Sequence, residues 1–278
     1  DMFEDYQQRV NAKEIRPGEP YLYINIFGEK ILNFPTKDHW KSLSRIEYVT
    51  KGLDIFRQKY KEWGIESIAF PPLGCGNGGL EWRDVGPLMY QKLRDLDIDV
   101  EIYAPHGTPK EQLKDEFLMS SGATKGKASA PETNIKAGWV AILEILNRLE
   151  NMPYVSYVGR VIFQKICYVA TRAGLDTGLE FRRGSYGPYS SQVAGMERTL
   201  SNANLIQESM IGQMVRVHTG KEYPGFREKH RQRIDAVNDK IDRVVDLFSR
   251  IKSTSQAEEV ATVLFAIDEI RSDAVQEM

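Results

Sequence analysis

The first part of the chain alternates short apolar runs with stretches in which apolar residues recur every three or four positions. Alternating β-rich runs predict strands, and helical periodicity predicts amphipathic helices. The predicted strands cover residues 21–27, 30–34, 67–73 and 99–105, and the predicted helices cover residues 43–63 and 82–96. Gly28-Glu29 separates the first two runs, as in a hairpin. Strands alternating with helices favour an α/β sheet covered by helices.

The second part has mostly helical periodicity. Its predicted elements are helices near residues 139–149, 161–174 and 192–200, a small hairpin around Gly212, and two closing helices near residues 226–251 and 257–270. The fold class we expect is therefore an α/β domain followed by a mainly α-helical one.

A polar stretch separates the two parts. After Met119 the sequence runs SSGATKGKASAPETN, without a large apolar residue, which is typical of a linker. At about 150 residues per domain, 278 residues predict two domains. We place them at residues 1–118 and 135–278, with a linker over 119–134.

Composition narrows the functional classes. With 37 basic and 39 acidic residues the formal net charge is −2, which argues against a strongly basic nucleic-acid-binding domain. Two cysteines provide neither a disulfide framework nor a Cys-based zinc site, and we expect no metal. No apolar run approaches the ~18 residues of a membrane span, and we expect a cytoplasmic protein with no membrane partner. Because the first residue is Asp, we expect the sequence to begin inside a longer natural chain.

The segment PPLGCGNGGLEW, residues 71–82, joins a predicted buried strand to a predicted helix. Its four glycines permit positive φ and let backbone N–H groups converge beside a helix N-terminus, an arrangement that suits a diphosphate. The spacing fits neither the Walker phosphate loop nor the Rossmann fingerprint. The alternative is a tight turn without a ligand. Cys75, between two glycines, is interpreted as a small buried spacer rather than a nucleophile.

Lys37 follows Pro35 and Thr36 at the exit of the second predicted strand, the edge where α/β sheets place ligands. A lysine there could stabilise charge on a departing base, or attack an anomeric carbon if burial lowered its pKa. The alternative is a solvated surface lysine.

The glycine loop with its Leu-Glu-Trp exit, together with the upstream FPTKDHW, resembles the macrodomain of DarG-type antitoxins. The resemblance implies a macrodomain-like α/β/α sandwich with a mixed sheet, which hydrolyses the N-glycosidic bond of ADP-ribosylated thymidine in DNA. It implies Lys37 as the catalytic residue and no cofactor beyond ADP-ribose as ligand and product. Family members begin with a further strand and loop, so we expect the N-terminal part of the macrodomain to be missing here. The implied ADP-ribose-binding residues are Thr36, Leu73, Gly74, Cys75, Gly76, Asn77, Gly78 and Gly79.

Residues 159–193 resemble the Panacea-type domain of antitoxins and proteolysis adaptors, through a helix with Lys165 and Tyr168 followed by SYGPYS. The Tyr-Gly-Pro-Tyr segment itself predicts a turn followed by a new helix. The resemblance implies that this domain binds and inhibits the DarT ADP-ribosyltransferase toxin, with ADP-ribosylated single-stranded DNA as the substrate of the first domain. Two alternatives stay open: a catalytically inactive ADP-ribose reader, and a protease adaptor that acts only by protein binding.

Asp235, Asp239, Asp242 and Asp246 recur at spacings that predict one face of a single helix. At 1.5 Å rise per residue, neighbouring carboxylates would lie about 6 Å apart, close to the phosphate repeat of a nucleic-acid strand. We interpret them as a toxin-binding surface that mimics DNA. The alternatives are a plain solvated face, and contact through the basic run at residues 227–233.

Overall fold

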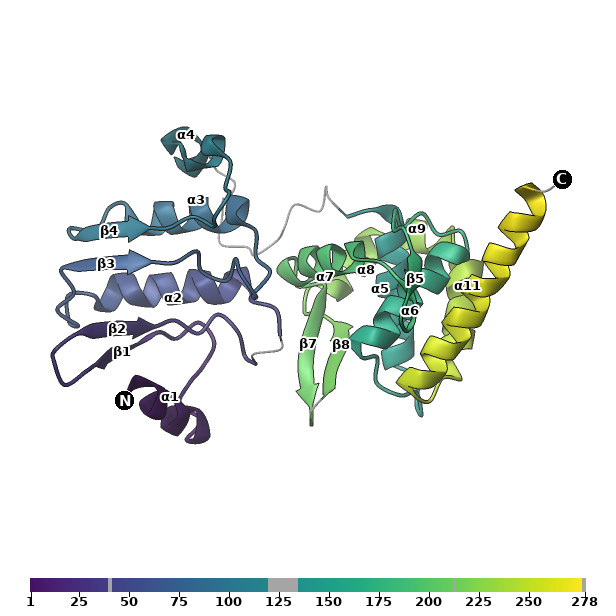
Figure 1. Ribbon diagram of the computed structural model, residues 1–278, viewed down its shortest axis with the longest axis horizontal. Helices are drawn as coiled ribbons and strands as arrows, with labels where there is room; N and C mark the ends of the chain where they lie inside the picture. Colours follow the sequence, from purple (N-terminus) through teal and green to yellow (C-terminus); the bar gives the residue numbers. More distant parts are fainter. Residues whose placement is uncertain (40–41, 120–134, 213, 277–278) are drawn as a thin grey trace. The chain divides into compact units, whose positions relative to one another are not determined.

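The computed structural model describes residues 1–39, 42–119, 135–212 and 214–276, with side chains up to residue 271. The chain forms two compact units, Asp1–Ala128 and Ser129–Met278 (Figure 1). Apart from Met119, the predicted linker lies outside the described residues. The domain boundaries within it stay a prediction.

The first unit has the alternating α/β order that the sequence predicts. Its elements are α1 (Met2–Asn11), β1 (Tyr21–Ile24), β2 (Lys30–Asn33), α2 (Ile46–Lys59), β3 (Ser67–Phe70), α3 (Trp82–Leu93), β4 (Asp99–Ile102), the 3-10 helix η1 (Lys110–Leu113) and α4 (Asp115–Met119). Strands β1 and β2 pair antiparallel as the predicted hairpin, and β3 pairs parallel with β4. Both kinds of pairing are thus present, as expected for a mixed α/β fold.

Apolar side chains of the two long helices form the core of this unit. Val49, Leu53 and Phe56 on α2 are fully buried, and Phe56 meets Phe70 of β3 edge to face with ring centroids 5.3 Å apart. Figure 1 shows β2, β3 and β4 pointing in one direction, so the segments that follow them emerge at a common edge. That edge carries Lys37 and the glycine loop.

The second unit is mainly helical, as predicted. Its elements are α5 (Ala137–Glu150), α6 (Arg160–Arg172), β5 (Arg182–Gly184), β6 (Gly187–Tyr189), α7 (Gln192–Asn202), β7 (Ile206–Ile211), β8 (Met214–Thr219), α8 (Tyr223–Lys229), α9 (Arg231–Asp235), α10 (Asn238–Ser249) and α11 (Thr254–Gln276). The predicted hairpin around Gly212 is confirmed by the antiparallel pair β7–β8.

The predicted single helix over residues 226–251 is wrong. The chain leaves helical geometry at His230 (φ −105°, ψ 12°) and again at Val237 (φ −121°, ψ 18°), which divides the segment into α8, α9 and α10. The apolar period continues across both breaks because each short helix packs on the same core. The His230 ring lies 4.2 Å from that of Phe226, so side-chain packing accompanies the first break.

The Tyr-Gly-Pro-Tyr segment differs in part from its prediction. The turn lies at Ser185 and Tyr186, and Gly187–Tyr189 form strand β6 against β5 before α7 begins. The buried ammonium of Lys165 on α6 donates to the carbonyl of Pro188 at 2.9 Å. Because a buried ammonium needs an acceptor, this bond attaches the hairpin to α6.

One carboxylate is buried in the core of the second unit. Glu144 on α5 is completely buried and accepts hydrogen bonds from Arg148 (2.8 Å), Arg227 (2.7 Å) and the hydroxyl of Tyr223 (2.6 Å). Burial alone would raise its pKa, but these donors outweigh burial and lower the pKa of Glu144 to about 2. Arg227, which the sequence offered as part of a basic contact surface, is therefore a structural partner of Glu144.

None of the described helices is long and apolar enough to span a membrane.

Candidate functional site

The glycine loop folds into consecutive turns through its own backbone. The N–H of Cys75 donates to the carbonyl of Pro72, and that of Leu80 to the carbonyl of Gly74, both at 3.0 Å. Gly74 (φ +72°) and Gly79 (φ +76°) occupy the left-handed region, where L side chains are strained. Glycine is thus required at these two positions for the turns that shape the loop.

Several other N–H groups of the loop have no protein acceptor among the described residues, including those of three successive residues, 76–78. Within the described residues, the amides of Gly74, Gly76, Asn77 and Gly78 donate no hydrogen bond. Backbone N–H groups are nearly always paired with protein or water, and a short row of unpaired ones is a site for an anionic ligand. The loop therefore has the donors that the sequence predicted for a diphosphate.

Lys37 lies within one hydrogen bond of the loop. Its Nζ donates to the carbonyl of Asn77 at 2.6 Å, although 40 residues separate them in sequence. The hydroxyl of Thr36 lies 2.9 Å from that of Ser44, which lies two residues before the first residue of α2. The structure thus brings together the lysine, the threonine and the glycine loop, as their positions after β2 and β3 predicted.

The other residues expected at the loop are more enclosed. Leu73 is buried in the core, and Cys75 is half-buried with its Sγ 3.7 Å from the carbonyl of Leu73. Burial, with a smaller effect of Asp84, raises the pKa of the Cys75 thiol to about 11. The thiol is therefore protonated at neutral pH, which agrees with a spacer rather than a nucleophile.

A groove runs between β2 and β3 and reaches the loop at Leu73. Its volume is about 1030 Å³, and both strands line it along their length. Among the described residues, β2 pairs only with β1 and β3 only with β4, so one edge of each strand has no paired neighbour. The groove thus lies next to the glycine loop, within the same unit.

The four aspartates do not form one continuous ladder. Asp235 is the last residue of α9, whereas Asp239, Asp242 and Asp246 lie on α10. All four are exposed, but Asp242 accepts from Arg148 at 2.6 Å, and Asp246 from Arg250 at 2.7 Å. The expected regular repeat of about 6 Å is interrupted at the break near Val237.

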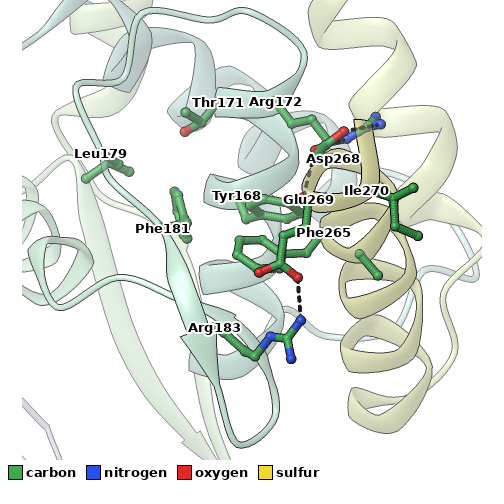
Figure 2. A pocket seen from close by; sticks show the side chains of 11 residues that line it. Tyr168, Thr171, Arg172, Leu179, Phe181, Arg183, Phe265, Asp268, Glu269 and Ile270 are labelled. Carbon is green, nitrogen blue, oxygen red and sulfur yellow. Dashed lines mark hydrogen bonds and ion pairs between the residues drawn. The ribbon is translucent and has the colours of Figure 1, made fainter. Parts of the chain in front are cut away.

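Sequence reasoning missed a cavity of about 630 Å³ in the second unit. Figure 2 shows the rings of Tyr168, Phe181 and Phe265 gathered at this cavity, with Arg172 and Asp268 at its rim. The guanidinium of Arg172 pairs with Asp268 at 2.7 Å, and the phenol of Tyr168 donates to the same carboxylate at 3.2 Å. Tyr168 and Arg172 lie on α6, whereas Phe265 and Asp268 come from α11, about 100 residues further along the chain, so no local pattern predicts the cavity.

Comparison with known proteins first defines the class of the N-terminal unit. Residues 3–89 match the family model described as Macro domain. The unit with the glycine loop is therefore a macrodomain, and its α/β order agrees with that class.

Several relatives define the family more closely. A DNA ADP-ribosyl transferase-DNA ADP-ribosyl glycohydrolase fusion protein from Thermosipho africanus (strain H17ap60334) is 42% identical over 141 residues, which cover 44% of this chain and 36% of that protein. A DNA ADP-ribosyl glycohydrolase from Mycobacterium tuberculosis (strain ATCC 25618 / H37Rv) is 30% identical over 214 residues, which cover 73% of this chain and 56% of that protein.

The chain is also similar to a solved macrodomain structure. The macrodomain of Mycobacterium tuberculosis DarG is 37% identical, with a TM-score of 0.36, and the match covers 37% of this chain and 71% of that chain. The chain is thus similar to DNA ADP-ribosyl glycohydrolases over most of its length. It spans between 36% and 56% of the length of the curated relatives named above.

Proposed function

We propose that the chain hydrolyses the N-glycosidic bond between ADP-ribose and a thymidine in DNA, and that its second unit binds and inhibits the DarT transferase. Relatives named DNA ADP-ribosyl glycohydrolase support the reaction, and a relative that fuses a transferase to the glycohydrolase supports the partner. The observation that carries the proposal is the 2.6 Å hydrogen bond between Lys37 Nζ and the Asn77 carbonyl, which joins an ammonium group to the glycine loop.

The loop binds the diphosphate of ADP-ribose. The unpaired amides of Gly74 and residues 76–78 supply donors for phosphate oxygens, and the following helix α3 adds its N-terminal dipole. Binding at this point leaves the ribose next to the exit of β2, where Lys37 lies.

Lys37 acts on the bond that breaks. In the reaction the bond between the anomeric carbon and the base nitrogen breaks, the oxygen of a water molecule bonds to that carbon, and the base leaves with a proton from the water. The transition state resembles an oxocarbenium ion, while negative charge develops on the departing base. The ammonium of Lys37 compensates that negative charge, a form of electrostatic stabilisation that strengthens as the bond lengthens.

A release assay tests the enzymatic part. The chain is incubated with a single-stranded oligonucleotide that carries ADP-ribosylated thymidine, and freed ADP-ribose is quantified by chromatography. Lys37→Ala is expected to lower the rate by about 100-fold or more, as loss of one transition-state donor does. Lys51→Ala, which removes an exposed lysine on α2 of the same unit, is expected to leave the rate unchanged.

Each outcome of that assay has a definite meaning. Release by the wild-type chain and loss in Lys37→Ala support the hydrolase. Binding of ADP-ribose without any release supports an inactive reader instead. An unchanged rate in Lys37→Ala contradicts the assigned role of the lysine.

The second unit is proposed to bind DarT through the exposed carboxylates of α10. An enzyme that modifies DNA needs a basic surface for the phosphate backbone. Asp239, Asp242 and Asp246 are all exposed, and two of them, Asp242 and Asp246, each also pair with one arginine of this unit. The opposite face of α10 buries Ile241 and Val244, which fixes the aspartates on the outer side. Asp235 on α9 extends the negative surface beyond the helix break.

Matched charge variants test this surface. Asp239→Asn/Asp246→Asn is expected to weaken DarT binding by about 10-fold or more, because charge complementarity at an interface is lost. Glu180→Gln/Glu259→Gln removes two exposed carboxylates elsewhere in the unit and is expected to change the Kd by less than about 3-fold. Equal effects of the two pairs would contradict the α10 surface. No binding by the wild-type chain would contradict the toxin-binding role and favour the adaptor.

A further inference from the structure

Ser44 closes a circuit of contacts around the candidate site. Its side chain is only 1% exposed, and its hydroxyl lies 2.9 Å from the hydroxyl of Thr36. Its backbone N–H donates to the carbonyl of Gly78 at 2.8 Å. Thr36 and Lys37 are neighbours in the chain, and so are Asn77 and Gly78. The hydrogen bond from Lys37 to Asn77 therefore completes a closed ring of contacts.

The circuit is tightly packed at the glycine loop. A Cβ on Gly78 would overlap the hydroxyl of Ser44 and the carbonyl oxygen of Gly74, and a Cβ on Gly74 would lie 3.0 Å from Cβ of Ser44. The serine hydroxyl therefore occupies space that a loop side chain would otherwise need. Close contact on this side leaves little freedom for the loop to move relative to Ser44.

We infer that Ser44 is a positioning residue, which fixes the ammonium of Lys37 relative to the glycine loop through Thr36. The inference rests on the proposed hydrolysis of ADP-ribosylated DNA and deepens it. The two links from Ser44 are separable, because the hydroxyl holds Thr36 whereas the backbone N–H holds Gly78. Ser44→Ala removes the first link and keeps the second. The loop should then still bind the diphosphate while the lysine is less well placed for the reaction.

Turnover and affinity should therefore respond differently. Ser44→Ala is expected to lower kcat for ADP-ribose release by about 10- to 100-fold, the usual cost of a displacement near 1 Å at a reacting centre. The Kd for free ADP-ribose should change by less than about 3-fold, since the backbone link to Gly78 persists. Ser42→Ala removes a second buried serine two residues earlier and is expected to change neither quantity.

A double-mutant cycle shows whether Ser44 acts through Thr36. Thr36→Val should lower kcat as Ser44→Ala does, and the double variant should be no slower than either single variant because both remove the same hydrogen bond. Thr36→Ser keeps the hydroxyl and should retain most of the wild-type rate. Additive losses, or a Ser44→Ala rate within about 3-fold of wild type, would overturn the inference.

A readout independent of turnover separates this inference from the proposed function. The rate of acylation of the Lys37 amine, followed by mass spectrometry, should rise several-fold in Ser44→Ala and stay unchanged in Ser42→Ala, because the variant weakens the placement of Lys37 against Asn77. An unchanged labelling rate in Ser44→Ala overturns the positioning role. If the wild-type chain releases no ADP-ribose, the proposed reaction fails, and the labelling rates alone decide the role of Ser44.

Discussion

The buried cluster around Glu144 in the second unit and the glycine loop of the macrodomain treat their polar groups in opposite ways. In the second unit, Glu144 is fully buried and accepts hydrogen bonds from Arg148, Tyr223 and Arg227, so this carboxylate has its partners within the protein. In the macrodomain, the amides of Gly74 and residues 76–78 have no acceptor among the described residues. Buried polar groups that satisfy one another hold a fold together, whereas polar groups left without protein partners mark the place for a ligand.

The largest expected effect comes from breaking the satisfied cluster. Glu144→Ala leaves Arg148 and Arg227 without their shared carboxylate and should destabilise the second unit by about 3–5 kcal/mol. Chemical denaturation monitored on the second unit measures the loss. ADP-ribose binding by the macrodomain, which contains none of these groups, serves as the control. A loss below about 1 kcal/mol would contradict the structural role of the cluster.

The next effect concerns the tight side of the glycine loop. Gly78→Ala should lower the free energy of unfolding of the macrodomain by about 2 kcal/mol, because the new methyl group overlaps Ser44 and the Gly74 carbonyl. At Gly76 a Cβ meets no atom within 4 Å and φ is not positive. Gly76→Ala should therefore be neutral or stabilise by about 0.5 kcal/mol. Thermal unfolding compares the two, and equal losses would show that the packing around Gly78 is described wrongly.

A partly buried carboxylate, that of Glu197, should have a smaller and pH-dependent effect on stability. Glu197 on α7 is partly buried without a hydrogen bond to any described residue, and burial, with the nearby charge of Glu208, raises its pKa to about 7. Between its ordinary value of 4.5 and about 7 the folded chain holds a proton that the unfolded chain has lost, so stability falls as pH rises through this window. Glu197→Gln should therefore stabilise the protein by about 1–2 kcal/mol at pH 8 and hardly at all at pH 4.5. Denaturation at the two pH values measures the gain, and a gain of equal size at both would contradict the assignment.

The smallest effect belongs to charges on the surface. The pair of Asp246 on α10 and Arg250, the residue that caps its C-terminus, is exposed. Asp246→Asn should cost at most about 0.5 kcal/mol, since solvent screens such pairs. A similar loss for Asp246→Asn and Glu144→Ala would remove the distinction between the buried cluster and the surface. The small expected cost makes this variant suitable for the DarT-binding measurement.

Much of the macrodomain could be predicted because its signals are local. The hairpin of β1 and β2 follows from two β-rich runs around Gly28-Glu29, and the helices follow from apolar spacing. The proximity of Lys37 to the glycine loop could also be predicted, because segments that follow parallel strands emerge at the same edge of a sheet.

The remainder depends on contacts between distant residues. Ser44 has no sequence signal, because a single serine before a helix gains its meaning only from Thr36 and Gly78. The breaks at His230 and Val237 were missed because apolar spacing continues through them. Arg148 lies one helical turn after Glu144 on α5, but Tyr223 and Arg227 come from α8, 79 and 83 residues further along the chain, so no local pattern relates these two to Glu144.

The binding of a diphosphate by the unpaired loop amides is the central claim, and amide NMR on the ¹⁵N-labelled chain tests it most directly. The account predicts that ADP-ribose shifts the amide resonances of Gly74 and residues 76–78 strongly, and those of Cys75, Gly79 and Leu80 less, because the latter already donate within the loop. Adenosine, which lacks the diphosphate, should leave the first group nearly unchanged. Absence of shifts in the first group at saturating ADP-ribose, or equal shifts with adenosine, would contradict the account.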